Sequence, residues 1–134
     1  MKPKISLITL GVQNMARSLS FYRGGLGFEL HNYKEGDDHV MFRLEGTWLA
    51  LFPRKNLAED AQVVSEGFGF PRFTLAHNVK TKNAVDELFA HAVAVGANPV
   101  KTPQDTFWGG YSGYFADPDG FLWEVAFNPF IDLT

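Results

Sequence analysis

The chain contains no cysteine, and this absence excludes disulfide frameworks, zinc–thiolate sites and cysteine nucleophiles. It also lacks an excess of positive charge, because the formal net charge is -3 and the basic residues are scattered along the chain. Proteins that bind nucleic acid or anionic membranes through their charge carry clustered basic residues. We therefore expect neither nucleic acid nor a membrane as a partner.

Long apolar runs are missing as well, and no basic-then-apolar leader is recognisable, so a cytoplasmic protein is expected. The remaining composition, 46% hydrophobic and 20% charged residues, is typical of a chain that folds rather than one that stays disordered. A length of 134 residues suits one ordinary domain with its own core.

The first half of the chain carries a strand, a helix and three further strands. Residues 5–12 are apolar and rich in β-formers, Asn14 suits the cap of the following helix, and the glycines at 24, 25 and 27 end that helix. Further strands are predicted at residues 28–33, 39–44 and 47–52, and the last two form a hairpin.

The second half repeats this order. A strand is predicted at residues 73–79, and a helix with an apolar stripe covers residues 80–95 and ends at Gly96. Three strands follow at residues 98–101, 110–116 and 121–127, and the sequence Asp117-Pro-Asp-Gly120 predicts a tight turn between the last two.

The two halves align on each other with an offset of 67 residues, which places Leu7-Ile-Thr-Leu-Gly-Val12 on Thr74-Leu-Ala-His-Asn-Val79. This predicts an α+β fold of two tandem βαβββ modules within a single domain, 1–134. Module one covers residues 1–52, an irregular connector covers 53–71, and module two covers 72–134. The alternative is a chance alignment of two unrelated α+β stretches.

Two segments carry a resemblance to a known family. Gly11-Val-Gln-Asn-Met-Ala-Arg-Ser-Leu-Ser-Phe-Tyr22 with Leu26-Gly27-Phe28, and Tyr114-Phe-Ala-Asp-Pro-Asp-Gly-Phe-Leu-Trp-Glu124, resemble the opening and closing signatures of the glyoxalase/bleomycin-resistance/dioxygenase (vicinal oxygen chelate) superfamily. The resemblance spans nearly the whole chain. It implies a U-shaped mixed-sheet cup with the helices outside and a ligand cavity within.

The same resemblance implies four positions for the ligands of a divalent metal, and these correspond to Leu7, Ala50, Thr74 and Glu124. Only Glu124 supplies a carboxylate, whereas leucine and alanine have no donor atom and threonine has a neutral hydroxyl. We therefore expect no metal and no other cofactor, with a metal-dependent mechanism kept as the alternative.

The four histidines are the other candidate ligands. His91 lies on the polar side of its helix and is expected on the surface, whereas strand alternation turns His77 away from Thr74 and towards the helix layer. We favour a structural, hydrogen-bonded role for His77. His31 and His39 lie near strand ends, where a bulge could direct one of them to a metal site with Glu124.

Alternation also predicts the wall of the cup. If Ala50 and Glu124 point inward, so do Trp48 and Phe52 in the first half and Leu122 and Ala126 in the second. Glu124 then stands in an apolar and aromatic surrounding, as a general base or as a hydrogen-bonding anchor for an amine or hydroxyl of a ligand. The competing interpretation is an inherited carboxylate satisfied by a neighbouring Arg, Tyr or water.

Residues 106–115 gather Trp108, Tyr111 and Tyr114 around three glycines. Glycines let the backbone approach a ligand closely and aromatic rings give stiff contact surface, so the segment is interpreted as a lip of the cavity. The alternative is a β-bulge with aromatic core packing. Arg17 and Arg43 are further groups that could meet an anionic ligand, although Arg17 is placed on the exposed side of its helix.

The leading functional hypothesis is a metal-independent binding protein for a small apolar or aromatic molecule, with Glu124 as its polar anchor. The second is a glyoxalase-like lyase or isomerase, or a dioxygenase-like enzyme, that uses a divalent metal. A third is an interaction domain whose cup is filled by its own side chains. We expect a homodimer, because pairing would cover edge strands and apolar surface and because members of the family that the chain resembles commonly dimerise.

Overall fold

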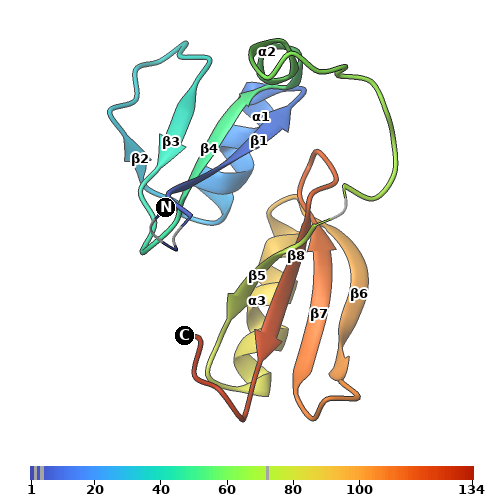
Figure 1. The fold of residues 1–134 in the computed structure, drawn as a ribbon. Coiled ribbons are helices and arrows are strands. Elements are labelled where there is room, and N and C mark those ends of the chain that lie inside the picture. Colours follow the sequence, from blue (N-terminus) through green and yellow to red (C-terminus); the bar gives the residue numbers. More distant parts are fainter. Residues whose placement is uncertain (2, 4, 72) are drawn as a thin grey trace. The chain divides into compact units, whose positions relative to one another are not determined.

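The computed structural model describes residues 1, 3, 5–71 and 73–134, and it divides into two compact units, Met1–Gly67 and Phe68–Thr134. Each unit contains one four-stranded sheet with helices (Figure 1). The predicted α+β class with two tandem modules is therefore confirmed. None of the helices among the described residues is long and apolar enough to cross a lipid bilayer.

The first unit begins with strand β1 and a short helix. Its elements are β1 (Leu7–Val12), α1 (Met15–Leu19), the π-helical turn η1 (Ser20–Gly25), β2 (Leu30–His31), β3 (Val40–Phe42), β4 (Trp48–Pro53) and α2 (Arg54–Asp60). The sheet order is β1-β4-β3-β2, with β1 parallel to β4 and the other pairs antiparallel.

The second unit repeats the topology. Its elements are β5 (Leu75–Asn78), α3 (Lys82–Ala94), β6 (Asn98–Asp105), β7 (Tyr111–Ala116) and β8 (Leu122–Phe127). The sheet order is β5-β8-β7-β6, again with one parallel pair, β5 with β8, and antiparallel neighbours. The two sheets are thus built on one plan, which is what a duplicated sequence predicts.

Aromatic packing forms the core of the first unit. The Asn14 side chain accepts a hydrogen bond from the Arg17 backbone N–H (3.0 Å), which confirms the predicted cap. The helix then widens into η1, which buries Phe21 and Tyr22. The Tyr22 ring lies 5.9 Å from the ring of Phe42 in β3. One face of the sheet therefore packs on these helical residues and provides the buried side chains Leu10, Val12, Val40, Phe42, Leu49 and Leu51.

The predicted irregular connector is partly wrong, because residues 54–60 of it form helix α2. A Cβ atom added to Gly11 would lie 3.3 Å from the Arg54 Cα atom and 3.4 Å from Leu57 Cδ2, so α2 packs closely on β1 at this glycine. The sequence Lys-Asn-Leu-Ala-Glu has adequate helix propensity. The prolines and glycines on either side obscured it in the sequence.

The core of the second unit lies between α3 and strands β6 to β8. The Thr81 hydroxyl caps α3 by accepting from the Ala84 N–H (3.1 Å), and Gly96 follows the helix with a φ of 118°. That backbone conformation favours glycine, which confirms the predicted end of the helix. The predicted turn after β7 is confirmed as well, since the Asp117 carboxylate accepts from the backbone N–H groups of Asp119 and Phe121.

Strand β6 runs to Asp105, four residues beyond the predicted end at Lys101. It pairs with β7 through two register shifts, between Pro99 and Lys101 and between Lys101 and Gln104. Its two prolines, Pro99 and Pro103, lie on the edge strand of the sheet, where a missing N–H is tolerated. Those prolines masked the strand in the sequence.

Gly113 in β7 lies under this irregular strand. A Cβ atom added to it would stand 2.8 Å from the Lys101 carbonyl oxygen and from the Pro103 nitrogen, and both are backbone atoms that cannot rotate away. We expect Gly113→Ala to lower the free energy of unfolding by about 1–3 kcal/mol, as overpacking does. Urea unfolding followed by circular dichroism measures it.

Gly24→Ala is the matched control, because an added Cβ atom at Gly24 meets nothing within 4 Å. We expect it to change the free energy of unfolding by less than about 1 kcal/mol, in the stabilising direction. Equal losses for the two variants would contradict the close approach of β6 to Gly113.

Candidate functional site

Ala50 and Glu124 occupy equivalent places in the two sheets. In the parallel pairs, Ala50 lies opposite Thr9 and Glu124 lies opposite Ala76. Thr9 and Ala76 are separated by the same 67 positions that the sequence alignment uses. The register of both parallel pairs therefore agrees with the internal duplication.

The face of the second sheet that carries Glu124 is turned away from α3. Tyr111 in β7 donates a hydrogen bond to Asp86 of α3, so the odd-numbered residues of β7 point towards the helix. Tyr114 points to the opposite face, and its register partner Glu124 shares that face. We call the surface formed by Ala76, Tyr114, Glu124 and Ala126 the Glu124 face.

Tyr114 is the polar neighbour of Glu124. Burial of the phenol raises the pKa of Tyr114 above its usual value of 10.0, and the charge of Glu124 and a hydrogen bond to it raise this pKa further. The neutral phenol is thus favoured, because it can donate a hydrogen bond to the Glu124 carboxylate. On the other side of Glu124 stands Ala76, whose methyl group offers no partner.

The residues at the predicted metal positions do not fit a metal ion. Leu7 is exposed and lies opposite Trp48, Ala50 is fully buried, and Thr74 is exposed just before β5. Within the described part of the chain, no three or more His, Asp or Glu side chains are grouped so that they could hold a metal. One carboxylate without imidazole or further carboxylate ligands is a poor donor set for a divalent transition metal.

In the first sheet the corresponding surface carries Trp48. The buried Leu49 and Leu51 point to the helical side, so Trp48, Ala50 and Phe52 point to the other. Met41 is the register partner of Ala50, and His31 is the register partner of Met41, so both point to the same side as Ala50. We call this surface, formed by Thr9, His31, Met41, Arg43, Trp48, Ala50 and Phe52, the Trp48 face.

Histidines stand at both ends of the Trp48 face. The His31 ring lies 4.9 Å from the Trp48 ring, and the His39 ring lies 5.3 Å from the Phe52 ring. The Arg43 guanidinium Nη2 is 3.1 Å from His31 Nδ1, and its Cζ atom is 5.8 Å from the centre of the Trp48 ring. His31, Arg43 and Trp48 therefore form one cluster.

His77 differs from the prediction. It lies opposite the buried Val125, on the side of the sheet that faces α3, as alternation requires. It is nevertheless exposed, and no hydrogen bond of its side chain is found among the described residues. The reason is that β5 is an edge strand while α3 packs on β6, β7 and β8, so the helix layer does not cover His77. Arg17 and His91 are exposed, as expected.

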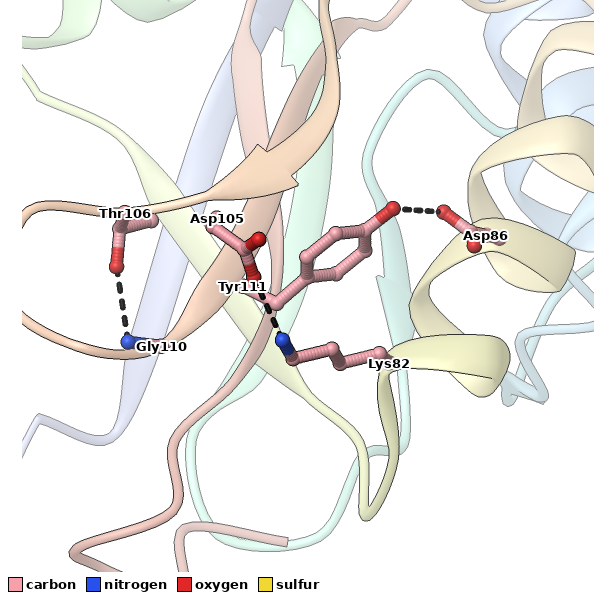
Figure 2. A network of polar contacts seen from close by, with 6 residues as sticks. All are labelled: Lys82, Asp86, Asp105, Thr106, Gly110 and Tyr111. Carbon is pink, nitrogen blue, oxygen red and sulfur yellow. Dashed lines mark hydrogen bonds and ion pairs between the residues drawn. The ribbon is translucent and has the colours of Figure 1, made fainter.

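The structure separates the three aromatic residues of the predicted lip. Tyr114 lies on the Glu124 face, but the Tyr111 hydroxyl donates to Asp86 Oδ1 (2.7 Å), as Figure 2 shows. The Tyr111 ring also lies 5.6 Å from the ammonium of Lys82. These two contacts with α3 hold Tyr111 on the side of the sheet opposite to Tyr114 and Glu124.

Lys82 and Thr106 extend this network (Figure 2). The Lys82 ammonium pairs with the Asp105 carboxylate at 2.6 Å, and the Thr106 hydroxyl accepts from the Gly110 N–H at 3.0 Å. Trp108 folds back over Gly110, where an added Cβ atom would lie 1.9 Å from the indole Cζ3 atom. The segment is a hairpin in which Gly110 leaves room for the Trp108 ring.

The sequence did not predict the contact between Arg43 and His31. Both residues lie on strands whose alternation was visible, but β2 is only two residues long, and its pairing with β3 could not be read from the chain. For Glu124 the sequence left a neighbouring Arg, Tyr or water open as the partner, and the register of β7 and β8 places Tyr114 there. The one signal that the sequence offered was that the two residues of each pair lie in predicted strands that are neighbours along the chain.

The matching families and structures agree with this architecture. Residues 4–125 match the model of the Glyoxalase/Bleomycin resistance protein/Dioxygenase superfamily. The chain belongs to this superfamily. A glyoxalase-related enzyme from Fulvimarina pelagi is 33% identical with a TM-score of 0.83, over 95% of this chain and 89% of that one. The structure of a lactoylglutathione lyase from Agrobacterium tumefaciens is 23% identical with a TM-score of 0.73 over 100% of both chains, and it shows the superfamily fold alone.

Curated relatives within the superfamily are metallothiol transferases. The protein named Metallothiol transferase FosB from Staphylococcus epidermidis is 35% identical over 74 residues, which cover 55% of this chain and 50% of that protein. The protein of the same name from Shouchella clausii is 28% identical over 129 residues, or 90% of this chain and 77% of that protein. The chain thus spans about half the length of the first relative.

The pairing of Tyr114 with Glu124 predicts a coupled titration. Because the pKa of Tyr114 is raised, this group stabilises the fold below pH 10 and loses its contribution as the pH rises through the folded-state pKa. We expect Glu124→Gln to lower the Tyr114 pKa towards 10.0, since it removes the charge and leaves burial. Titration of the tyrosine ¹³Cζ resonances, assigned with Tyr114→Phe, measures it.

Tyr111 is the internal control for this titration. Its pKa is raised first by the hydrogen bond to Asp86, followed by burial and by the charges of Asp86 and Asp105. Glu124→Gln should leave the Tyr111 resonance unchanged. A Tyr114 titration that is the same with glutamine as with glutamate would show that the two side chains are uncoupled.

Proposed function

We propose that this member of the superfamily is a small-molecule binding protein that works without a divalent metal. Its ligand is apolar or aromatic and carries an amine or a hydroxyl, which the Glu124 carboxylate holds. The observation that carries the proposal is the donor set: Leu7, Ala50 and Thr74 stand where the family resemblance implies metal ligands. A fold that is inherited does not oblige a chain to keep the chemistry of its relatives.

The surroundings of Glu124 support the role of an anchor. Tyr114 offers a phenol whose pKa is raised and which stays neutral at ordinary pH, and Ala76 beside the carboxylate has no polar side-chain group to compete with a ligand. A carboxylate on an apolar surface binds an ammonium group more strongly than the same carboxylate would in open water. Such a pair of groups distinguishes a ligand with a hydrogen-bond donor from a hydrocarbon.

A metal-dependent transferase or lyase is the second candidate. It is favoured by the names of relatives, since the FosB proteins are called metallothiol transferases and one similar structure is a lactoylglutathione lyase. This candidate needs a metal or an acid–base pair. Glu124 would be its general base.

Elemental analysis separates the two candidates. We expect protein incubated with Ni²⁺, Zn²⁺ or Mn²⁺ and then desalted to retain far less than one metal ion per chain, because a single carboxylate supplies too few ligands. Glu124→Gln serves as the reference and should give the same residual content. Stoichiometric metal that disappears in this variant, together with turnover of hemithioacetals in the metal-loaded protein, would establish the second candidate.

Binding of an aromatic amine tests the anchor itself. We expect benzylamine to raise the melting temperature of the protein in a thermal-shift titration, and Glu124→Gln to abolish the rise, because the glutamine lacks the charge that pairs with the ammonium. Glu87→Gln is the control, since Glu87 lies on α3 and accepts a hydrogen bond from Asn83. An equal loss in both variants would show that the effect is one of net charge alone.

A further inference from the structure

The Trp48 face carries an exposed cation, Arg43, that pairs with no acidic side chain in the described part of the chain. Among the described residues, the Arg43 side chain has two partners, the His31 ring and the Trp48 ring, and neither is negatively charged. In a protein whose formal net charge is -3, carboxylates are in excess, yet none pairs with this guanidinium. The side chain is therefore available to an external anion.

His31 fixes the position of that cation. Since a guanidinium can only donate, His31 Nδ1 accepts from Arg43 Nη2 at 3.1 Å, which assigns the imidazole proton to Nε2. The His31 ring is held in turn by its edge contact with Trp48, at 4.9 Å and an interplanar angle of 62°. Arg43 thus contacts one residue of β2 and one residue of β4, and its other guanidinium N–H groups make no hydrogen bond among the described residues.

Another arginine of the same unit lacks this arrangement. The Arg23 Cζ atom lies 5.9 Å from the centre of the Tyr33 ring, a distance like that between Arg43 and Trp48. No hydrogen bond from the Arg23 guanidinium to an imidazole is found in the described residues. The imidazole acceptor therefore distinguishes Arg43 from an ordinary arginine that stacks on an aromatic ring.

A hollow beside Trp48 gives room for the rest of a ligand. It measures about 500 Å³ and is lined by Ile5, Ser6, Gly46, Thr47 and Trp48. Trp48 therefore belongs both to the hollow and to the cluster with Arg43. Its indole offers a flat apolar wall of the kind that aromatic ligands pack against.

We infer that Arg43, His31 and Trp48 form a binding site for an aromatic monocarboxylate. The carboxylate accepts the free N–H groups of Arg43, whose planar fork matches its two oxygens, and the ring packs beside Trp48 in the hollow. A single guanidinium balances a single negative charge, which favours a carboxylate over a phosphate dianion. The site lies in the first unit and does not depend on Glu124.

Benzoate and its neutral analogue benzamide test the inference on the full chain. We expect benzoate to shift the Trp48 indole N–H resonance in ¹⁵N-labelled protein, with a saturable titration, and benzamide at the same concentrations to leave it in place. The resonance is assigned with Trp48→Phe. Equal shifts with both compounds would overturn the inference, because they would show that the carboxylate is not recognised.

Four variants test the separate parts of the site. Arg43→Gln should raise the benzoate Kd at least about tenfold, as the loss of a charged hydrogen-bond partner does, whereas Arg23→Gln should leave it within about twofold, since its guanidinium lies outside the site. His31→Leu should weaken binding because the guanidinium loses its acceptor. His31→Asn, whose amide oxygen can replace Nδ1, should recover most of the affinity.

Other results would overturn the inference. No benzoate shift in the wild type, an unchanged Kd in Arg43→Gln, or an equal loss in Arg23→Gln would each remove the site. Inorganic phosphate that shifts the Trp48 resonance where benzoate does not would exclude the aromatic carboxylate. Dispersed amide spectra of every variant establish that lost binding is not lost folding. Stoichiometric metal bound by Glu124 would end the proposed function and leave this inference standing.

Discussion

The parallel pairing of the first and last strand in each sheet is the constraint on which the rest of the structure depends. It places Thr9 beside Ala50 and Ala76 beside Glu124, and because side chains alternate along a strand, it decides which residues share each face. A slip of one residue would turn Glu124 towards α3 and bring Trp123 to the opposite surface. The buried Trp123, Val125, Leu49 and Leu51 prevent that slip, since each would lose its apolar surroundings.

The two sheets use the same plan for different chemistry. At the shared position, one has alanine between Thr9 and Met41, and the other has glutamate between Ala76 and Tyr114. The first sheet instead carries a cation near its edge, where Arg43 contacts His31 and Trp48. Duplication thus preserved the backbone, and divergence gave an acidic face to one copy and a basic cluster to the other.

The polar network around Tyr111 connects the aromatic hairpin to helix α3. Lys82 and Asp86 on α3 bind Asp105 and Tyr111, so the helix ties the end of β6 to the start of β7 (Figure 2). These contacts are exposed and add modest stability each, but they fix the orientation of the hairpin. Trp108 and Gly110 pack on each other within it. The aromatic residues therefore divide between the support of the hairpin and the Glu124 face.

The sequence by itself determined the two-module α+β plan, the caps at Asn14 and Gly96, the turn at Asp117, and the lack of donor atoms at Leu7 and Ala50. Each depends on residue type and on neighbours a few positions away, which is information that the chain carries locally. Only the tertiary structure decided that Tyr114 partners Glu124, that Arg43 meets His31, that Tyr111 turns to α3, and that His77 is left uncovered. Those features depend on strand register and on how far a helix extends over a sheet, and both are fixed by packing between residues distant along the chain.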